Sequence, residues 1–147
     1  MNLEIKESKD WTTDELEEIL SFISVPEFNG GTRLPSEADL SSVFSSLPSE
    51  SLAVWADASP SLCLSIIPID HILRTGLFHI SGDRRLPYGV TEKLVKGWLT
   101  RYAREGYSIR AFTTSEAVGR AARRIGFEDW GHDPQTGAWV GGFELHN

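Results

Sequence analysis

The residue best suited to acid–base chemistry in this sequence is His79. It lies in a segment, Leu77-Phe78-His79-Ile80, that reads as a strand, on which it shares a face with Leu77 and Ser81. A histidine with a pKa near neutrality on a central strand suits proton abstraction, either directly or through a water molecule. The alternative interpretation is a structural histidine held by a hydrogen bond, and both interpretations remain open.

Several other kinds of active site lack their sequence patterns here. No His/Cys spacing indicates a metal site, no Gly-Lys-Ser/Thr string indicates a P-loop, and no Ser–His–Asp arrangement is recognisable. Asp70 and His71 are adjacent and point apart, so we interpret them as loop residues. Cys63 lies in an apolar run and reads as a small buried hydrophobic residue, with a reactive thiol as the alternative.

The composition predicts one globular domain over residues 1–147. Of the 147 residues, 40% are apolar, which is enough for a sizeable core. No apolar run approaches the ~18–20 residues that cross a bilayer, and the acidic N-terminal segment is unlike a signal peptide. A single cysteine allows no internal disulfide, so we expect a reducing, cytoplasmic location. The net charge of −7 disfavours nucleic acids and anionic membranes as partners.

Hydrophobic periodicity divides the chain into strands and helices. The order predicts an α/β (α+β) fold, with a mixed, mostly antiparallel sheet of about seven strands and about four helices packed on it. The predicted elements are strand 3–6, a helix capped by Thr12 or Thr13, a loop over 26–35, a short helix over 36–47, a hairpin of strands 51–56 and 62–67, strand 77–80, helix 94–106, a strand around 109–111, a helix between Ser115 and Gly126, and a hairpin of strands 127–130 and 139–145.

The stretch from Leu94 to Phe127 carries the clearest pattern. Its first helix has an apolar stripe and closes on Gly106, which supplies a positive φ, and a short strand and a second helix ending in Gly126-Phe127 follow. This succession resembles the C-terminal half of the GNAT-type N-acyltransferases, and the string RRIGFEDWG (Arg123–Gly131) resembles the family's usual ending of its second large helix. The resemblance covers residues 74–145, and the order of elements extends it to the N-terminus.

The resemblance implies a coenzyme A site in the loop before the long helix. The family's consensus for this loop is Q/R-x-x-G-x-G/A, and the loop's backbone N–H groups at a helix N-terminus bind the pyrophosphate. One register places Gly89 and Thr91 on the two glycines and Leu86 on the Gln/Arg position. The other places Arg84 on the Gln/Arg position and Gly89 on the last glycine, but puts Pro87, which has no N–H, on the first. We prefer the first register because it keeps the helix stripe intact. The residues predicted to bind acetyl-CoA or another acyl-CoA are Arg84, Arg85, Gly89, Val90, Thr91 and Ser115.

The resemblance also implies an acid that protonates the leaving thiolate. In many family members a tyrosine on the second large helix has this role, but that position is Ala122 here. The family's frequent asparagine at the start of this helix corresponds to Ser115, which keeps the helix cap. Tyr88 and Tyr102 are the candidate replacements for the acid, and we select Tyr88, with His79 as the base.

Two hypotheses for the function therefore remain. The first is N-acyl transfer directly from acyl-CoA to an amine, for which the acidic surface suits a basic acceptor such as a polyamine, a lysine or an aminoglycoside. The second is a catalytically silent protein of the GNAT fold that acts as a binding or structural component, favoured by the degenerate loop and Ala122. The chain's size and ending are also similar to those of small GNAT-like phage proteins linked to virion assembly. That similarity implies a virion location and a homo-oligomer or an assembly protein as partner.

Overall fold

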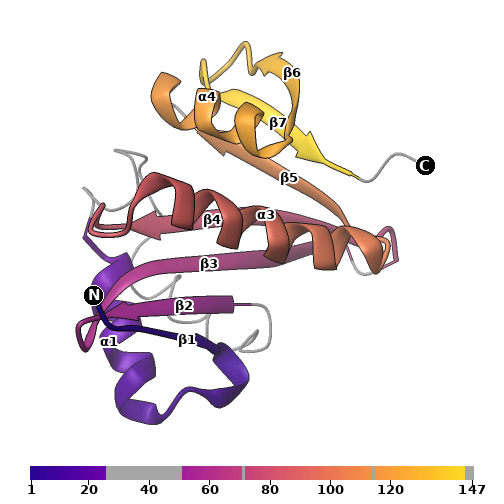
Figure 1. The fold of residues 1–147 in the computed structure, drawn as a ribbon. Helices are drawn as coiled ribbons and strands as arrows, with labels where there is room; N and C mark the ends of the chain where they lie inside the picture. Colours follow the sequence, from indigo (N-terminus) through magenta and orange to yellow (C-terminus); the bar gives the residue numbers. More distant parts are fainter. Residues whose placement is uncertain (26–50, 71, 114, 145–147) are drawn as a thin grey trace. The chain divides into compact units, whose positions relative to one another are not determined.

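The structure is a computed structural model that describes residues 1–25, 51–70, 72–113 and 115–144 (Figure 1). The loop predicted over 26–35 and the short helix predicted over 36–47 lie outside the described residues. The described elements are β1 (Leu3–Glu7), the 3-10 helix η1 (Ser8–Asp10), α1 (Thr13–Ile23), β2 (Ser51–Ala56), β3 (Ser59–Asp70), β4 (Thr75–Gly82), α3 (Tyr88–Arg104), β5 (Ser108–Thr113), α4 (Glu116–Ile125), β6 (Glu128–His132) and β7 (Trp139–Phe143).

The seven described strands form one mixed sheet in the order β1-β2-β3-β4-β5-β7-β6. The pairs β1–β2, β2–β3, β5–β7 and β6–β7 are antiparallel. β4 and β5 pair in parallel, with Thr75 opposite Ser108 and Leu77 opposite Arg110. The predicted α+β class, with a mostly antiparallel sheet of this size, is therefore confirmed.

The contacts divide the chain into two compact units, and we describe each by itself. The first comprises Met1–Ile67 with His79–Pro87, and the second comprises Pro68–Phe78 with Tyr88–Asn147. Strands β3 and β4 each run from one unit into the other, because their residue ranges cross these boundaries. That residues 1–147 form one domain stays a prediction. None of the helices in the described part of the chain is both long and apolar enough to cross a membrane.

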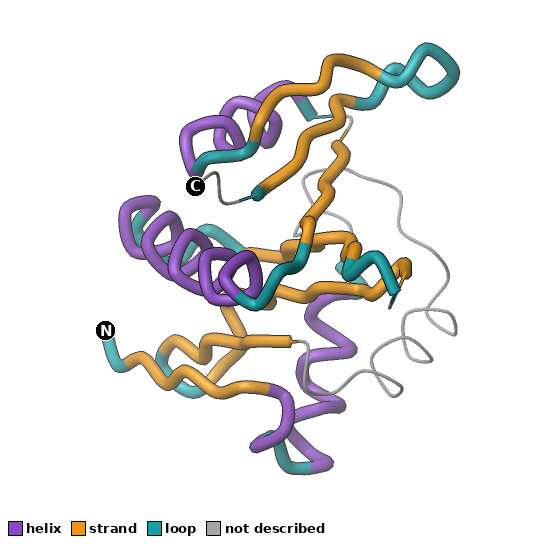
Figure 2. The backbone as a smooth tube through the Cα atoms, turned by 90° about the vertical axis from the view of Figure 1, so that its right-hand side faces the viewer, coloured by secondary structure: helices purple, strands orange, loops and turns teal. Residues whose placement is uncertain are grey.

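The first unit is built on the packing of α1 against the sheet. Thr12 caps this helix as predicted: its hydroxyl accepts from the Glu15 N–H, and the Glu15 carboxylate accepts from the Thr12 N–H. Figure 2 shows β1 leading from the N-terminus directly into the helical segment that begins at Ser8. The core between helix and sheet is apolar, and its buried members are Ile19, Phe22, Ile23, Ala53, Trp55 and Cys63.

The predicted hairpin of β2 and β3 is present, but its turn is tighter than predicted. Asp57 and Ala58 both have positive φ, at 50° and 67°, and Ala56 pairs directly with Ser59. A two-residue turn with both φ values positive matches the right-handed twist of the flanking strands. The second strand therefore begins at Ser59 rather than at the predicted residue 62, and Pro60 lies within it.

The second unit has an aromatic core between its helices and strands. α4 lies over β5 and β7 (Figure 1). The Trp98 ring packs edge-on to Tyr102 with centroids 5.1 Å apart, and the Phe127 ring lies 5.6 Å from that of Phe143. The predicted helix ends are confirmed, since Ser115 caps α4 and Gly126 closes it with a φ of 126°.

Three predicted element bounds in the second unit are wrong. The long helix begins at Tyr88 rather than at residue 94, because Pro87 directly before it suits a helix N-terminus. β6 begins at Glu128 and reaches His132, two residues past the predicted end at Trp130. The described part of β7 ends at Phe143, whereas the predicted strand ran to residue 145.

Candidate functional site

All three guanidinium nitrogens of Arg85 donate hydrogen bonds within the first unit. Nε donates to the Asp83 carboxylate at 2.6 Å, Nη1 to the Ala56 carbonyl and the Ser59 hydroxyl at 2.9 Å each, and Nη2 to the Ser59 and Pro60 carbonyls at 3.1 and 2.7 Å. A guanidinium bound in this way must give up protein hydrogen bonds before it can bind a phosphate. Arg85 therefore closes the β2–β3 hairpin, and we leave it out of the candidate site.

The neighbours of Arg85 have distinct environments. Burial alone would raise the pKa of Asp83, but hydrogen bonds from Ser61 and Arg85 outweigh it and hold that pKa below its ordinary value. Arg84 is exposed and has a φ of 70°, whereas Leu86 is buried. The register that places Arg84 on the Gln/Arg position therefore puts an exposed side chain there, whereas the other register puts the buried Leu86 there.

The remaining predicted loop residues form the first turn of α3, in the second unit. Tyr88 is the first helical residue, so Gly89, Val90 and Thr91 follow it within this turn. The N–H groups of the first three helical residues, Tyr88, Gly89 and Val90, have no acceptor within the helix, and they carry the positive end of the helix dipole. A Cβ added at Gly89 would meet nothing within 4 Å. This turn therefore combines donors that lack an acceptor within the helix with open space at Gly89, an arrangement that suits an anionic group.

Arg124, which the sequence analysis did not select, lies beside this turn. Its Nε donates to the Tyr88 hydroxyl at 3.3 Å, and its guanidinium carbon lies 5.1 Å from the centre of the Tyr88 ring. Both side chains are exposed, so the guanidinium adds a positive charge next to the first turn of α3. The grouping of Arg120, Arg123 and Arg124 in the sequence was a signal of local positive charge. It did not show which of the three lies near Tyr88.

Ser115 is at a different helix end. Its hydroxyl accepts from the Val118 N–H at 3.3 Å, and its own N–H donates to the Thr113 hydroxyl at 3.1 Å. A small cavity of about 30 Å³ adjoins this N-terminus of α4 within the second unit. Its polar lining includes the side chains of Thr113, Ser115, Glu116, Arg123 and His132. The structure therefore shows Ser115 as a helix cap, and its role toward a coenzyme stays a prediction.

His79 lies on β4, in the part that belongs to the first unit, and is partly buried. Burial lowers its pKa to about 4, so the sequence-based expectation of a pKa near neutrality is wrong. The imidazole is therefore neutral at pH 7 and can accept a proton, but it holds that proton weakly. Burial likewise raises the pKa of the Cys63 thiol to about 12, which agrees with the buried, unreactive interpretation of this cysteine.

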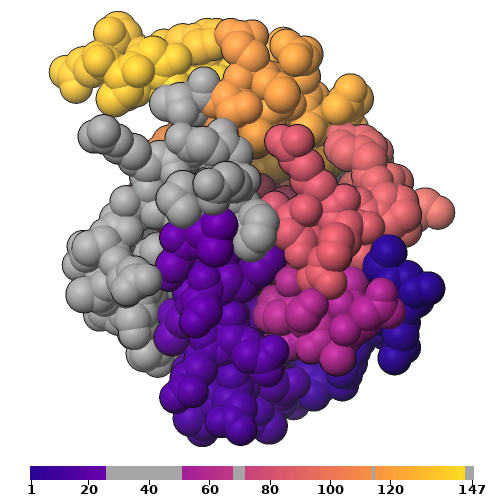
Figure 3. Space-filling model, turned by 90° about the vertical axis from the view of Figure 1, so that its left-hand side faces the viewer, coloured from indigo at the N-terminus to yellow at the C-terminus, as the bar shows by residue number. Residues whose placement is uncertain are grey.

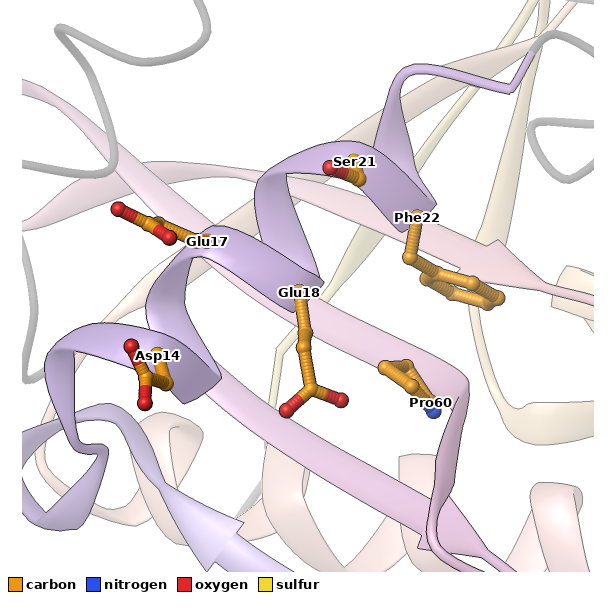
Figure 4. Close-up of a pocket in the computed structure, with 6 residues that line it drawn as sticks. All are labelled: Asp14, Glu17, Glu18, Ser21, Phe22 and Pro60. Carbon is orange, nitrogen blue, oxygen red and sulfur yellow. The ribbon is translucent and has the colours of Figure 1, made fainter.

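An open groove lies on the surface of the first unit, along α1. It has a volume of about 610 Å³ and lies between α1 and the start of β3. Figure 3 shows α1 at the surface, and Figure 4 shows the groove's side chains, with Phe22 and Pro60 facing each other beside the Glu18 carboxylate. Its lining residues are Asp14, Glu17, Glu18, Ser21, Phe22 and Pro60. Among the described residues no group of three or more His, Cys, Asp or Glu side chains could hold a metal ion.

Comparison with known proteins finds similarity in the fold but not in the sequence. No protein-family model matches the sequence, and no curated protein matches it either. Solved structures do match. The putative acetyltransferase yncA from Salmonella typhimurium, solved with its cofactor acetyl-CoA, has a TM-score of 0.75 and 12% identity over 100% of this chain and 96% of that one.

Two further matches are of the same kind. A GNAT superfamily phosphinothricin acetyltransferase from Sinorhizobium meliloti, in complex with AcCoA, has a TM-score of 0.74 and 14% identity over 99% of this chain and 89% of that one. A chain of the NatC complex bound to Gag peptide and CoA has a TM-score of 0.73 and 15% identity over 99% and 100%. These identities are too low to show more than the fold, and the chain therefore has the fold of the GNAT acetyltransferases.

Proposed function

We propose that this chain binds an acyl-CoA through the first turn of α3 and transfers the acyl group directly to an amine. The observation that carries the proposal is the first turn itself: donors without helical acceptors, open space at Gly89, and the Arg124 guanidinium beside Tyr88. The fold supports it, because several structures with this fold were solved with CoA or acetyl-CoA. In this proposal the backbone of Gly89, Val90 and Thr91 binds the pyrophosphate.

The proposal gives Tyr88 a different role from the predicted one. Tyr88 is adjacent to Gly89, and the whole pantetheine arm separates the pyrophosphate of an acyl-CoA from its thioester. If Gly89 holds the pyrophosphate, the Tyr88 hydroxyl is therefore too far from the sulfur to protonate it. We assign Tyr88 to the phosphate end, where its hydroxyl orients Arg124. With Ala122 at the family's tyrosine position, we expect slow loss of an unprotonated thiolate.

His79 is the proposed proton acceptor for the amine. Its neutral imidazole can take a proton directly or through water, although a pKa of about 4 makes it a weak base. We propose a basic acceptor, since the net charge is −7 and the α1 groove carries the carboxylates of Asp14, Glu17 and Glu18. One protein of this fold is described as a spermidine N-acetyltransferase, with a TM-score of 0.67 and 14% identity.

A catalytically silent binding or structural role is the second candidate. Two observations favour it: Ala122 replaces the customary acid, and the pKa of His79 is well below that of an efficient base at neutral pH. Coenzyme binding alone does not separate the two candidates, because a silent relative can retain the site. A virion location and an assembly role remain part of this second proposal.

Two measurements test the proposed function. Acetyl-CoA at about 100 times its Kd should stabilise the protein by ~2.7 kcal/mol, which is a rise of a few degrees in the melting temperature. Release of CoA from acetyl-CoA is then followed across a panel of amines that includes polyamines, lysine and aminoglycosides. Stabilisation with release above background supports the acyltransferase. Stabilisation without release supports the silent protein. If neither stabilisation nor release is observed, the chain shares only its fold with the acetyltransferases.

A further inference from the structure

The strand β1 stands at one end of the sheet and is regular along its length. In the described part of the chain it comes first in the strand order and pairs with β2 through all five residues, from Leu3 opposite Ala56 to Glu7 opposite Leu52. The strand at the other end, β6, has a register shift between Asp129 and His132. Bulges of this kind protect a sheet edge from pairing with another chain, and the register of β1 with β2 contains none.

The two faces of β1 have different chemistry. Leu3 and Ile5 share one face and are 38% and 49% exposed, which is high for aliphatic side chains in a strand. Glu4 and Lys6 share the other face, where the Lys6 ammonium lies 2.8 Å from Glu15 and 3.2 Å from Glu4. The end strand therefore presents two apolar side chains, followed by Glu7, on one face and a pair of opposite charges on the other.

This pattern is self-complementary in an antiparallel arrangement. Residues directly opposite each other in such a pair lie on the same face, so a two-fold axis must pass through a residue position. An axis through Ile5 overlaps all five residues of β1 and places each Glu4 opposite Lys6 of the second copy. Axes through Glu4 or through Lys6 would instead set two like charges directly opposite each other, which is destabilising.

We infer that β1 is an interface for a second copy of this chain, which adds its own β1 in antiparallel register about Ile5. In this dimer the two Ile5 side chains are neighbours at the centre of one face, with Leu3 opposite Glu7 on either side of them, and two Glu4–Lys6 pairs form across the other face. The occupant is another copy because Glu4 and Lys6 flank Ile5 symmetrically, so an antiparallel second β1 sets opposite charges against each other in both pairs. The interface involves none of the residues of the proposed coenzyme site, so the test of dimerisation does not depend on the proposed function.

The test is the oligomeric state of charge variants of the full chain, measured by sedimentation velocity over a range of concentrations. Glu4→Lys sets lysines opposite each other in both cross-strand pairs, so dimerisation should weaken about tenfold or more. Glu17→Lys on α1 makes the same change in net charge away from β1, and its dimerisation should be unchanged. Circular dichroism and melting temperatures establish that each variant folds.

Mixing two variants tests the register itself. Lys6→Glu alone sets carboxylates opposite each other, but a mixture of Glu4→Lys with Lys6→Glu restores two opposite-charge pairs in a heterodimer. We expect each variant to be mainly monomeric alone and the mixture to form dimers. A wild type that stays monomeric at high concentration would overturn the inference. So would a Glu4→Lys variant that dimerises as well as the wild type, or a mixture of folded variants that remains monomeric.

Discussion

The two stretches on either side of Pro87 contain residues of the same predicted site but have opposite environments. Before Pro87, the Arg85 guanidinium and the Asp83 carboxylate are bound to each other and to the β2–β3 hairpin. After Pro87, the first turn of α3 has open space at Gly89 and an exposed arginine beside it. The first stretch uses its polar groups to hold the fold, whereas the second leaves its polar groups accessible to a ligand.

This difference shows that an arginine's availability depends on its partners rather than on its position in a motif. Arg85 lies within the predicted coenzyme loop and is occupied by carbonyls 25 to 29 positions earlier in the chain. Arg124 lies outside that loop, and its hydrogen bond to Tyr88 spans 36 positions. The following predictions test this contrast, in decreasing order of expected effect.

The largest effect is expected at Gly89. In Gly89→Val, the added side chain would fill the approach of a phosphate to the backbone of the first turn, so the Kd for CoA should rise about 100-fold or more. The fold should persist, because a Cβ at this position meets no atom within 4 Å. Isothermal titration calorimetry measures the affinity, and a thermal melt checks the fold.

Gly97→Val is the matched control for Gly89→Val. Gly97 lies in the same helix, and a Cβ there also meets nothing within 4 Å, so it makes the same chemical change farther along α3. Its CoA affinity should equal that of the wild type. Equal affinities in both valine variants would show that the first turn of α3 is not the coenzyme site.

The next effect is on stability and belongs to the other side of Pro87. Arg85→Ala removes the donors for the hairpin carbonyls and leaves Asp83 without its ion pair, so unfolding should become easier by about 2 kcal/mol. Arg84→Ala, at the exposed neighbouring position, should change stability by less than about 0.5 kcal/mol. Urea unfolding compares the two, and equal stability losses would contradict the structural role of Arg85.

The sequence predicted local structure well because the determinants of that structure are local. The Thr12 capping box, the Ser115 cap and the Gly126 helix end each depend on residues within one helical turn, and all three are present. The element order followed from the same signals, and the order was enough to predict the fold class. The early start of α3 was missed because the apolar stripe begins later than the helix, although Pro87 gave the signal.

The candidate site was harder to predict because its properties depend on distant residues and on burial. The sequence places Arg84 and Arg85 side by side and both are exposed, yet the Arg85 guanidinium is held by a hairpin 25 to 29 positions earlier in the chain. The pKa of His79 depends on how much water reaches the imidazole, and this burial cannot be predicted from the residues next to His79 in the sequence. The spacing predicted Gly89 as part of the site, but it could not show that Arg124, 36 positions from Tyr88, lies beside that residue.

A moderate effect is expected at Arg124. Arg124→Gln removes the charge beside the first turn of α3, so the Kd for CoA should rise about 3- to 10-fold, and less so at high salt. Arg120→Gln makes the same change one turn earlier on α4, where the arginine pairs weakly with Glu116 at 3.9 Å. Its Kd should be close to that of the wild type. The same loss in both variants would indicate a general charge effect rather than a site at Tyr88.

The smallest effect concerns the pH dependence contributed by His79. Its pKa is about 4 in the folded protein and near 6.5 in an unfolded chain, so the unfolded chain binds the proton first as the pH falls. The stability that His79 contributes is therefore complete above pH ~6.5 and is lost as the pH falls toward 4, with about 1 kcal/mol lost at pH ~5.5. His79→Gln removes this titration, so its melting temperature should fall less than that of the wild type over this range.

The same residue gives a kinetic test if the chain is an acyltransferase. His79 has a pKa of about 4 and is therefore deprotonated between pH 5 and 7, so the wild-type kcat/KM should be flat with respect to His79 over this range. Because so weak a base contributes little to catalysis, His79→Gln should lower kcat/KM by a few-fold only, at most about 10-fold. A wild-type limb near pH 6.5 that disappears in the variant would show that water reaches the imidazole. A variant with wild-type rates but the altered stability profile would assign His79 a structural role, like that of Arg85 in holding the β2–β3 hairpin.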